Sequence, residues 1–256
     1  MRLIVTRPLA QAEALVAELR AGAVDAVALP LIDIAPASDP QPLRRAWQEL
    51  PSLALVMFVS ANAVQHFMQA RPPGIAWPEQ LLAGSTGPGT SAALRAAGVP
   101  ESALVEPLGE VFDSEALWAQ LRLRDWQGRR ALVVRGEGGR DWLAEQLGQA
   151  GASVDFVAAY QRVLPQLHAQ LLALRDAALA RPQQHLWSFS SSEAVANLQQ
   201  LSPGVDWSAS AAIAPHPRIV AELQRLGFGQ VRLVAVGGAA LAAAAREGRP
   251  IQSAAP

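Results

Sequence analysis

The chain has 256 residues, 51% hydrophobic and 17% charged, and a formal net charge of −1. This balance is typical of a globular protein of about two domains and argues against a basic surface for nucleic acid. The sequence contains no cysteine and no lysine, which excludes disulfides, thiolate metal sites and Schiff-base chemistry. The four histidines lack the spacing of metal ligands, so we expect no metal site.

Membrane and export signals are also missing from the pattern. No apolar run reaches the ~18 residues of a membrane span. The opening residues MRLIVTRP enter a strand pattern directly, without the order of a signal peptide. We therefore expect a cytoplasmic protein that does not contact a membrane.

Short apolar runs alternate with amphipathic patterns along the chain. After Arg7, the residues Ala12, Leu15, Val16 and Leu19 make one apolar stripe of a helix. Strands without internal polar alternation, separated by helices, indicate parallel sheets covered on both faces. In chain order the predicted elements are strand 2–6, helix 9–21, strands 25–34 and 53–59, helix 61–70, strand 80–83, helix 89–97, strand 103–106, helix 113–121, strand 131–135, helix 139–149, strand 153–163, helix 166–180, strand 185–189, helix 192–200, strand 210–214, helix 216–226, strand 231–235 and helix 237–246.

The chain repeats itself at about half its length. LIVTR at 3–7 returns as LVVR at 132–135, and FVSANAV at 58–64 returns as FSSSEAV at 189–195. The turn GPGT at 87–90 has a looser counterpart, APHP, at 214–217. We therefore predict two similar α/β units made by duplication, with the chemistry between them.

Two long apolar segments, 25–34 and 153–163, occupy matching places in the repeats and suit a two-stranded linker. The Pro/Asp/Ser stretch at 35–42 is then predicted to be the loop by which the chain enters the second domain. The domains would be 1–35 with 164–256, and 38–160, joined by linker strands at about 30–38 and 157–164.

The strand-to-helix turns carry the candidate binding groups. Helix N-termini with hydroxyls and arginines suit carboxylates or phosphates, and in parallel sheets they lie beyond the carboxyl ends of strands. The candidates at these turns are Arg7, Ser60, Asn62, Thr90, Arg135, Gly136, Ser191, Ser192 and His216.

Each candidate also has a structural interpretation. Ser60 and Ser191 suit helix caps, the two arginines suit structural ion pairs, and His216 suits either a cap or a ligand contact. GEGGR at 136–140 lacks the pattern and the lysine of a phosphate-binding loop.

Three other histidines (His66, His168 and His185) are expected at the surface or at sheet edges. The tryptophans are expected in the cores and at the domain rims.

Tyr160 is the single tyrosine. It ends a proposed linker strand, where a cleft between domains would open. The alternative is a hydroxyl-tipped packing residue. No carboxylate pair or Ser–His–Asp arrangement can be assembled, so the predicted site holds an anion rather than attacking one.

These motifs, taken in order, resemble the uroporphyrinogen-III synthase family over nearly the whole chain. The resemblance rests on VTRP at 5–8, PLIDI at 30–34, FVSANAV, GPGT, DSEAL at 113–117, LVVRGEGGR at 132–140, AGASVDFVAAYQR at 150–162 and FSSSEAV.

The resemblance implies a cofactor-free lyase that cyclises hydroxymethylbilane, with loss of water and inversion of ring D through a spirocyclic pyrrolenine, to uroporphyrinogen III. It implies two α/β domains joined by a two-stranded linker, in a monomer that the upstream deaminase supplies with substrate. Tyr160 matches the tyrosine proposed to assist departure of the hydroxyl. Ser60, Asn62, Thr90 and Ser191 match substrate-binding turns, and His216 departs from the Thr or Ser common there.

Two alternatives stay open. One is a two-domain protein that binds an anion or a tetrapyrrole without turnover. The other is a degenerate synthase-like domain kept as a partner module.

Overall fold

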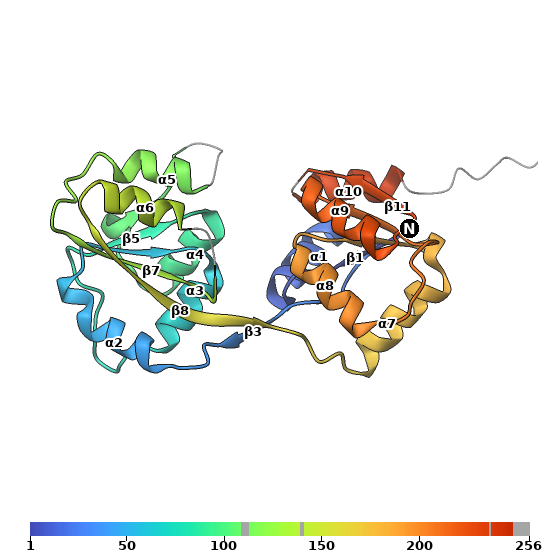
Figure 1. The fold of residues 1–256 in the computed structure, drawn as a ribbon, viewed down its shortest axis with the longest axis horizontal. Helices are drawn as coiled ribbons and strands as arrows, with labels where there is room; N and C mark the ends of the chain where they lie inside the picture. The colour runs from blue at the N-terminus through green and yellow to red at the C-terminus, as the bar shows by residue number, and fades with distance from the viewer. Residues whose placement is uncertain (109–112, 139–140, 236, 248–256) are drawn as a thin grey trace, which may run out of the picture. The chain divides into compact units, whose positions relative to one another are not determined.

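The computed structural model describes residues 1–108, 113–138, 141–235 and 237–247 (Figure 1). The chain divides into two compact units: unit 1 is Met1–Asp33 with Val163–Pro256, and unit 2 is Ile34–Arg162. It passes between them twice, once in strand β3 and once at the end of strand β8, and these strands are neighbours in one sheet. Unit 2 is therefore an insertion in unit 1.

Unit 1 is a five-stranded sheet in the order β11-β10-β9-β1-β2, with parallel neighbours throughout. Its strands are β1 (Arg2–Val5), β2 (Ala26–Ala28), β9 (His185–Ser188), β10 (Ala211–Ala214) and β11 (Gln230–Leu233). Its helices are α1 (Leu9–Ala21), α7 (Ala169–Ala180), the short η3 (Pro182–Gln184), α8 (Ser192–Leu201), α9 (Pro217–Leu226) and α10 (Gly238–Glu247).

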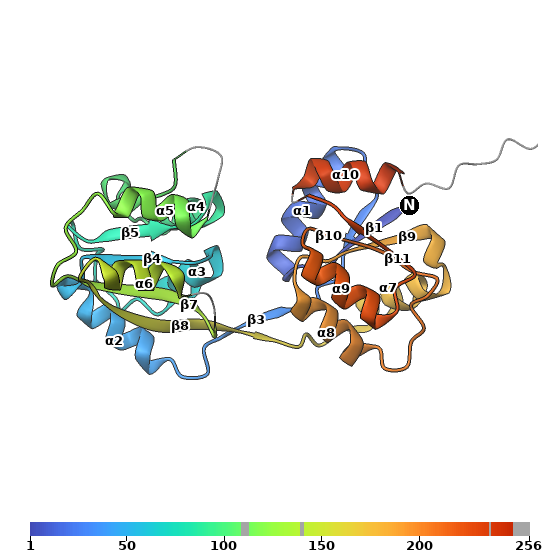
Figure 2. The ribbon, with the colours of Figure 1, turned by 45° about the horizontal axis from the view of Figure 1, so that its top comes forward.

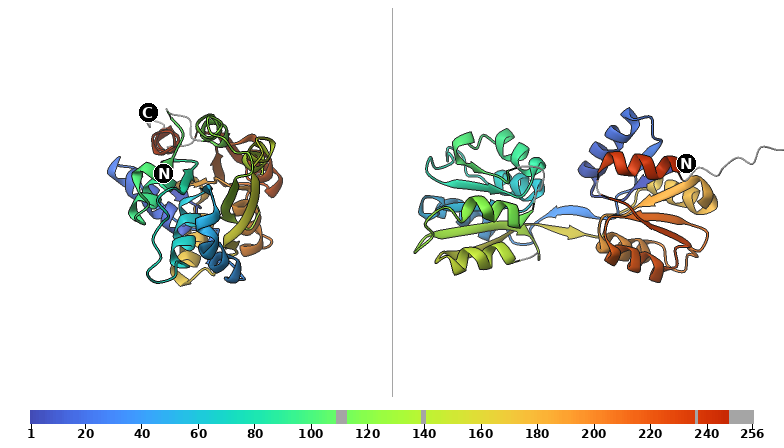
Figure 3. Two further views of the ribbon diagram at one scale, coloured as in Figure 1. Left: turned by 90° about the vertical axis from the view of Figure 1, so that its left-hand side faces the viewer. Right: turned by 90° about the horizontal axis from the view of Figure 1, so that it is seen from above.

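The two faces of this sheet bury different side chains. Leu3 and Val5 pack against α1 and α10, while α8 and α9 lie over the opposite face (Figure 3). Aromatic side chains also pack together in unit 1. The Trp207 ring stacks on Phe228, with ring centres 5.0 Å apart, and meets Trp187 edge-on, with ring centres 5.6 Å apart. Alternation along β1 thus divides its residues between two apolar layers.

Unit 2 is a six-stranded sheet in the order β3-β8-β7-β4-β5-β6 (Figure 2). Its strands are β3 (Asp33–Pro36), β4 (Leu55–Phe58), β5 (Leu82–Ser85), β6 (Leu104–Val105), β7 (Arg130–Gly136) and β8 (Ser153–Val163). Its helices are α2 (Gln41–Glu49), η1 (Leu50–Ser52), α3 (Ala61–Gln69), α4 (Pro88–Ala96), η2 (Glu101–Ala103), α5 (Ser114–Leu121) and α6 (Trp142–Gln149).

Alternation also sorts the core of unit 2. Val56 and Phe58 of β4 pack with α2, α3 and α4. Leu55 and Met57 of the same strand pack with α5 and α6 on the other face. Both faces of the sheet are covered, as buried parallel strands require.

The sequence repeat is a structural repeat. β1, with LIVTR, corresponds to β7, with LVVR; β9 and β4 precede the two F-x-S-x-x-A-V helices. Strand order is then the same in both units, β2-β1-β9-β10-β11 and β8-β7-β4-β5-β6. Equivalent turns therefore lie at equivalent places on the two sheets.

Two sequence predictions in the linker region are wrong. The segment 25–34 is not one strand: β2 ends at Ala28, and Pro30, which has no N–H to donate, separates it from β3. The expected entry loop at 35–42 is shorter than predicted: β3 extends to Pro36, and α2, whose Leu43, Ala46 and Trp47 are buried, begins at Gln41. The other elements match within three residues where they are described; residues 139–140, at the predicted start of α6, lie outside the described part.

Candidate active site

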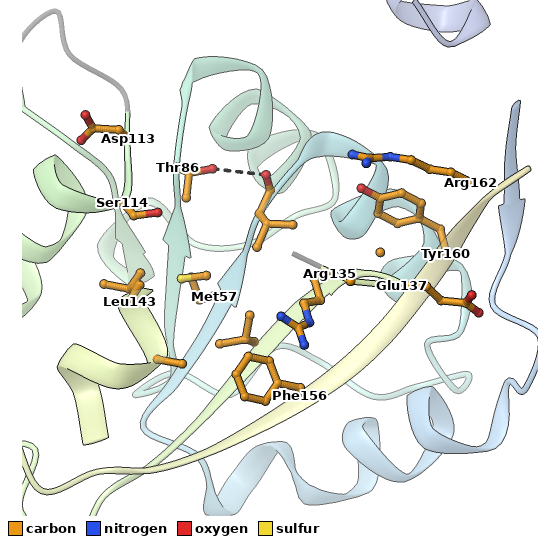
Figure 4. A pocket seen from close by; sticks show the side chains of 15 residues that line it. Met57, Thr86, Asp113, Ser114, Arg135, Glu137, Leu143, Phe156, Tyr160 and Arg162 are labelled. Carbon is orange, nitrogen blue, oxygen red and sulfur yellow. Dashed lines mark hydrogen bonds between the residues drawn. The ribbon is translucent and has the colours of Figure 1, made fainter. Parts of the chain in front are cut away.

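A cavity of about 510 Å³ lies in unit 2 at the carboxyl ends of its parallel strands (Figure 4). Its walls come from the residues that follow β4 and β5, the end of β7, the starts of α5 and α6, and residues of β8. This is the edge of a parallel sheet where α/β proteins bind ligands. We take it as the candidate site.

Tyr160 borders this cavity although its side chain is buried, with 3% exposed. Its hydroxyl lies 3.2 Å from Oγ of Ser60. That serine also caps α3, because its Oγ accepts a hydrogen bond from the Ala63 N–H at 3.2 Å. The structural interpretation of Ser60 as a helix cap is therefore confirmed, and Ser60 meets Tyr160 across 100 residues of sequence. Their roles toward a substrate stay predictions.

Arg135 contributes a cation to the same cavity. Its guanidinium lies 4.2 Å from the centre of the Phe156 ring and donates to the exposed carboxylate of Asp141. The structural ion pair considered for this arginine is thus present. Its partner is exposed, so an anionic ligand can compete for the guanidinium. The lining also carries a second arginine, Arg162, and two carboxylates, those of Asp113 and Glu137.

Gly136, next in sequence, lines the cavity too. Its missing side chain leaves room for the ring of Tyr160.

Several lining residues were missed by the sequence prediction. Thr86 follows β5 and donates to the Val59 carbonyl at 3.3 Å. Asp113 caps α5 through the Ala116 N–H at 2.7 Å, and Phe156 and Arg162 project from β8 (Figure 4). The turn after β5 was a usable signal for Thr86, since it follows a buried strand directly.

Three predicted residues of unit 2, Ser60 among them, are not part of the lining. Asn62 is half-buried in the first turn of α3 and Thr90 is 6% exposed in the first turn of α4, and neither borders the cavity.

Unit 1 has a small pocket at the corresponding sheet edge, lined by Arg7 with Ser190 and Pro215. Burial lowers the pKa of Arg7, and the negative charge of Glu18 opposes that shift. The hydroxyl of Thr6 donates to the Ser188 carbonyl at 2.8 Å and holds the turn to β9.

The other three predicted residues of unit 1 lie at helix starts. Oγ of Ser191 accepts from the Glu193 N–H at 3.1 Å and caps α8. Nδ1 of His216 accepts from the Arg218 N–H at 3.1 Å and caps α9. The Ser192 hydroxyl is buried without a hydrogen-bond partner among the described residues. These three do not line the pocket around Arg7.

Two of the three histidines predicted at the surface or at sheet edges are partly or largely buried. His185 is 6% exposed, and its Nδ1 lies 3.0 Å from the Arg181 carbonyl. His66 is half-buried, its ring 6.0 Å from that of Tyr160, and desolvation lowers its pKa. His185 is the first residue of strand β9, and His66 lies in helix α3 with its ring toward Tyr160 of β8.

The described residues include no group of three or more acidic or histidine side chains placed to hold a metal ion. Among their helices none has the length and apolarity to cross a membrane.

Known proteins share both the sequence pattern and the fold. Residues 13–236 match the family model described as uroporphyrinogen-III synthase HemD. The uroporphyrinogen-III synthase of Salmonella typhimurium is 35% identical over 63% of the chain and 65% of its own length. That of Synechococcus elongatus is 31% identical over 81% of the chain and 78% of its own length.

Solved structures agree on the fold. A mutant uroporphyrinogen III synthase from Thermus thermophilus has a TM-score of 0.55 at 18% identity, covering 96% of the chain and 98% of its own. The Helicobacter pylori uroporphyrinogen-III synthetase has a TM-score of 0.59 at 16% identity, covering 96% and 100%. With the model match spanning most of the sequence, the chain belongs to the uroporphyrinogen-III synthase family.

Proposed function

We propose that the protein is a cyclising lyase that converts hydroxymethylbilane to uroporphyrinogen III and water. Ring closure with inversion of ring D would pass through a spirocyclic pyrrolenine. The observation that carries the proposal is the family match over residues 13–236, joined to a tyrosine that lines a ligand-sized cavity and meets the Ser60 hydroxyl.

The site chemistry supports this reaction. The substrate carries eight carboxylates, and the cavity lining includes Arg135, Arg162 and the N-terminus of α5, together with the acidic side chains of Asp113 and Glu137. Arginines and helix N-termini both favour carboxylates. Because the pyrroles react readily by themselves, the main task of the protein is to fold the substrate so that the substituted carbon of ring D attacks.

Tyr160 has the proposed catalytic role. As the hydroxyl of the bilane leaves, the phenol donates a hydrogen bond to the departing oxygen, which lowers the cost of its developing negative charge. Ser60 is the partner that orients the phenol. Asn62, Thr90, Ser191, Ser192, His216 and Arg7 remain proposed substrate contacts at the turns.

The test couples the purified protein to a deaminase that produces hydroxymethylbilane and separates the oxidised porphyrin isomers chromatographically. Predominantly type III isomer is the expected result. Type I isomer alone, the product of unassisted closure, with folded protein present would refute the proposal and favour binding without turnover.

The proposal extends to the working form of the enzyme. We propose a cytoplasmic monomer that receives its substrate from the deaminase. Light scattering of the purified protein, alone and mixed with the deaminase, tests the monomer and the hand-over.

A further inference from the structure

Tyr160 lies at an irregularity in the pairing of β7 with β8. Arg135 pairs with Ala158, but the next residue, Gly136, pairs with Tyr160, so Ala159 is one residue too many on its strand. Such a bulge re-aims the side chains that follow it. Without it, strict alternation would place Tyr160 on the face of Phe156 and Ala158.

The bulge changes the face to which Tyr160 belongs. Tyr160 packs in the same apolar group as Val157 and Ala159, on the side of the sheet that α3 covers. There its ring lies near His66 and its hydroxyl meets Ser60, both in the segment after β4. The Glu137 N–H donates to the Tyr160 carbonyl at 3.1 Å and closes the irregular pairing.

Gly136 leaves the space that the phenol ring occupies. A Cβ at this position would lie 2.8 Å from Cζ, 2.9 Å from Cε2 and 3.2 Å from the hydroxyl oxygen of Tyr160. The first two distances are far below a van der Waals contact, so the ring cannot keep its place beside any other residue. The glycine is required by this close approach and not by a left-handed backbone.

We infer that Gly136 is a positioning residue: its bare backbone and the facing bulge at Ala159 form the seat that holds the Tyr160 hydroxyl beside Ser60. The consequence for catalysis rests on the proposed function. The seat itself is a property of the structure and can be tested without turnover.

The structural test uses the fact that Tyr160 is the single tyrosine. Tyrosine labelled with 13C at Cζ gives one resonance, from the atom that a Cβ at position 136 would strike. We expect Gly136→Ala to shift this resonance. The control is Gly148→Ala, in α6 of the same unit, where a Cβ meets nothing within 4 Å. If the resonance does not move in folded Gly136→Ala, the inference that Gly136 positions the Tyr160 ring is wrong.

The catalytic test is a cycle with Tyr160→Phe. We expect Gly136→Ala to lower the rate of type III isomer formation on the order of tenfold or more, and to change it less than about twofold when Phe already occupies position 160. An equal loss in both backgrounds would overturn the inference, because Gly136 would then act independently of the phenol. If the unsubstituted protein makes no type III isomer, the proposed function fails while the resonance still decides on the seat.

A second variant covers the case in which Gly136→Ala does not fold. The shorter side chain in Gly136→Ala/Tyr160→Leu has no ring for the new Cβ to strike, so folding should return. Failure of this double variant to fold, with Tyr160→Leu folded, would contradict the seat.

Discussion

Removing the Ser60 hydroxyl should separate its two structural roles. In Ser60→Ala, α3 loses the cap on the Ala63 N–H, which costs about 1 kcal/mol of unfolding free energy. The Tyr160 hydroxyl, in a side chain only 3% exposed, also loses its partner. An unsatisfied buried hydroxyl costs about 1–3 kcal/mol, and the adjoining cavity admits water, so we take the lower end. The expected total is about 2 kcal/mol.

Two comparisons isolate the contribution of the phenol. Ser191→Ala removes the equivalent cap in unit 1, where Oγ accepts from the Glu193 N–H, and should cost about 1 kcal/mol. Ser60→Ala in a Tyr160→Phe background should also cost about 1 kcal/mol, because the phenol hydroxyl is already absent. The cycle thus predicts a coupling of about 1 kcal/mol between Ser60 and Tyr160.

Urea unfolding followed by tryptophan fluorescence and circular dichroism measures these differences. If the two units unfold in separate transitions, the transition of unit 2 is compared for Ser60 and that of unit 1 for Ser191. A coupling smaller than about 0.3 kcal/mol would refute the reasoning, since that is the scatter expected of independent sites.

Three more predictions concern catalysis, pH and the core. Tyr160→Phe should lower the rate of type III formation on the order of 100-fold with an unchanged circular dichroism spectrum; an unchanged rate in the coupled assay would remove the phenol from the mechanism. Desolvation lowers the pKa of His66 in the folded protein. The contribution of neutral His66 to the unfolding free energy is therefore complete above the ordinary histidine pKa. It is lost as the pH falls from the ordinary pKa toward the lower pKa of the folded state. Unfolding curves across this range should show a weaker loss on acidification in His66→Gln than in the parent, with the exposed His168→Gln as control; parallel curves for His66→Gln would contradict this. Trp207→Ala should cost about 3–5 kcal/mol of unfolding free energy, because the ring is 1% exposed and stacks on Phe228; half-buried Trp118→Ala should cost less, and equal costs measured in urea would contradict the burial argument.

Much of the fold was accessible from local sequence patterns. Helix α1 and strand β8 have the predicted bounds, because an apolar stripe and a long apolar run are local signals. Helix α2 carried a signal as well, with Leu43, Ala46 and Trp47 at helical spacing. No element was predicted for residues 43–49, and the predicted loop at 35–42 overlaps only the first two residues of α2, where proline is tolerated.

The candidate site was less accessible, because it depends on contacts between distant segments. The sequence placed Ser60 and Arg135 at strand ends but did not indicate that Ser60 meets Tyr160. It marked Gly136 as a substrate contact, whereas the structure adds the close approach of the phenol ring. The sequence did not distinguish Phe156 from other apolar strand residues, whereas the structure places its ring against the Arg135 guanidinium.

The sequence by itself determined the repeat, most of the strands and helices, the family and the turns that carry polar groups, because each depends on residues close together or on a recurring motif. Only the tertiary structure decided which of those groups face one another. The pairing of β7 with β8 slips by one residue at Gly136, and a one-residue slip changes the face that a side chain occupies. No local pattern encodes that slip, since it arises from packing between strands that the sequence keeps apart.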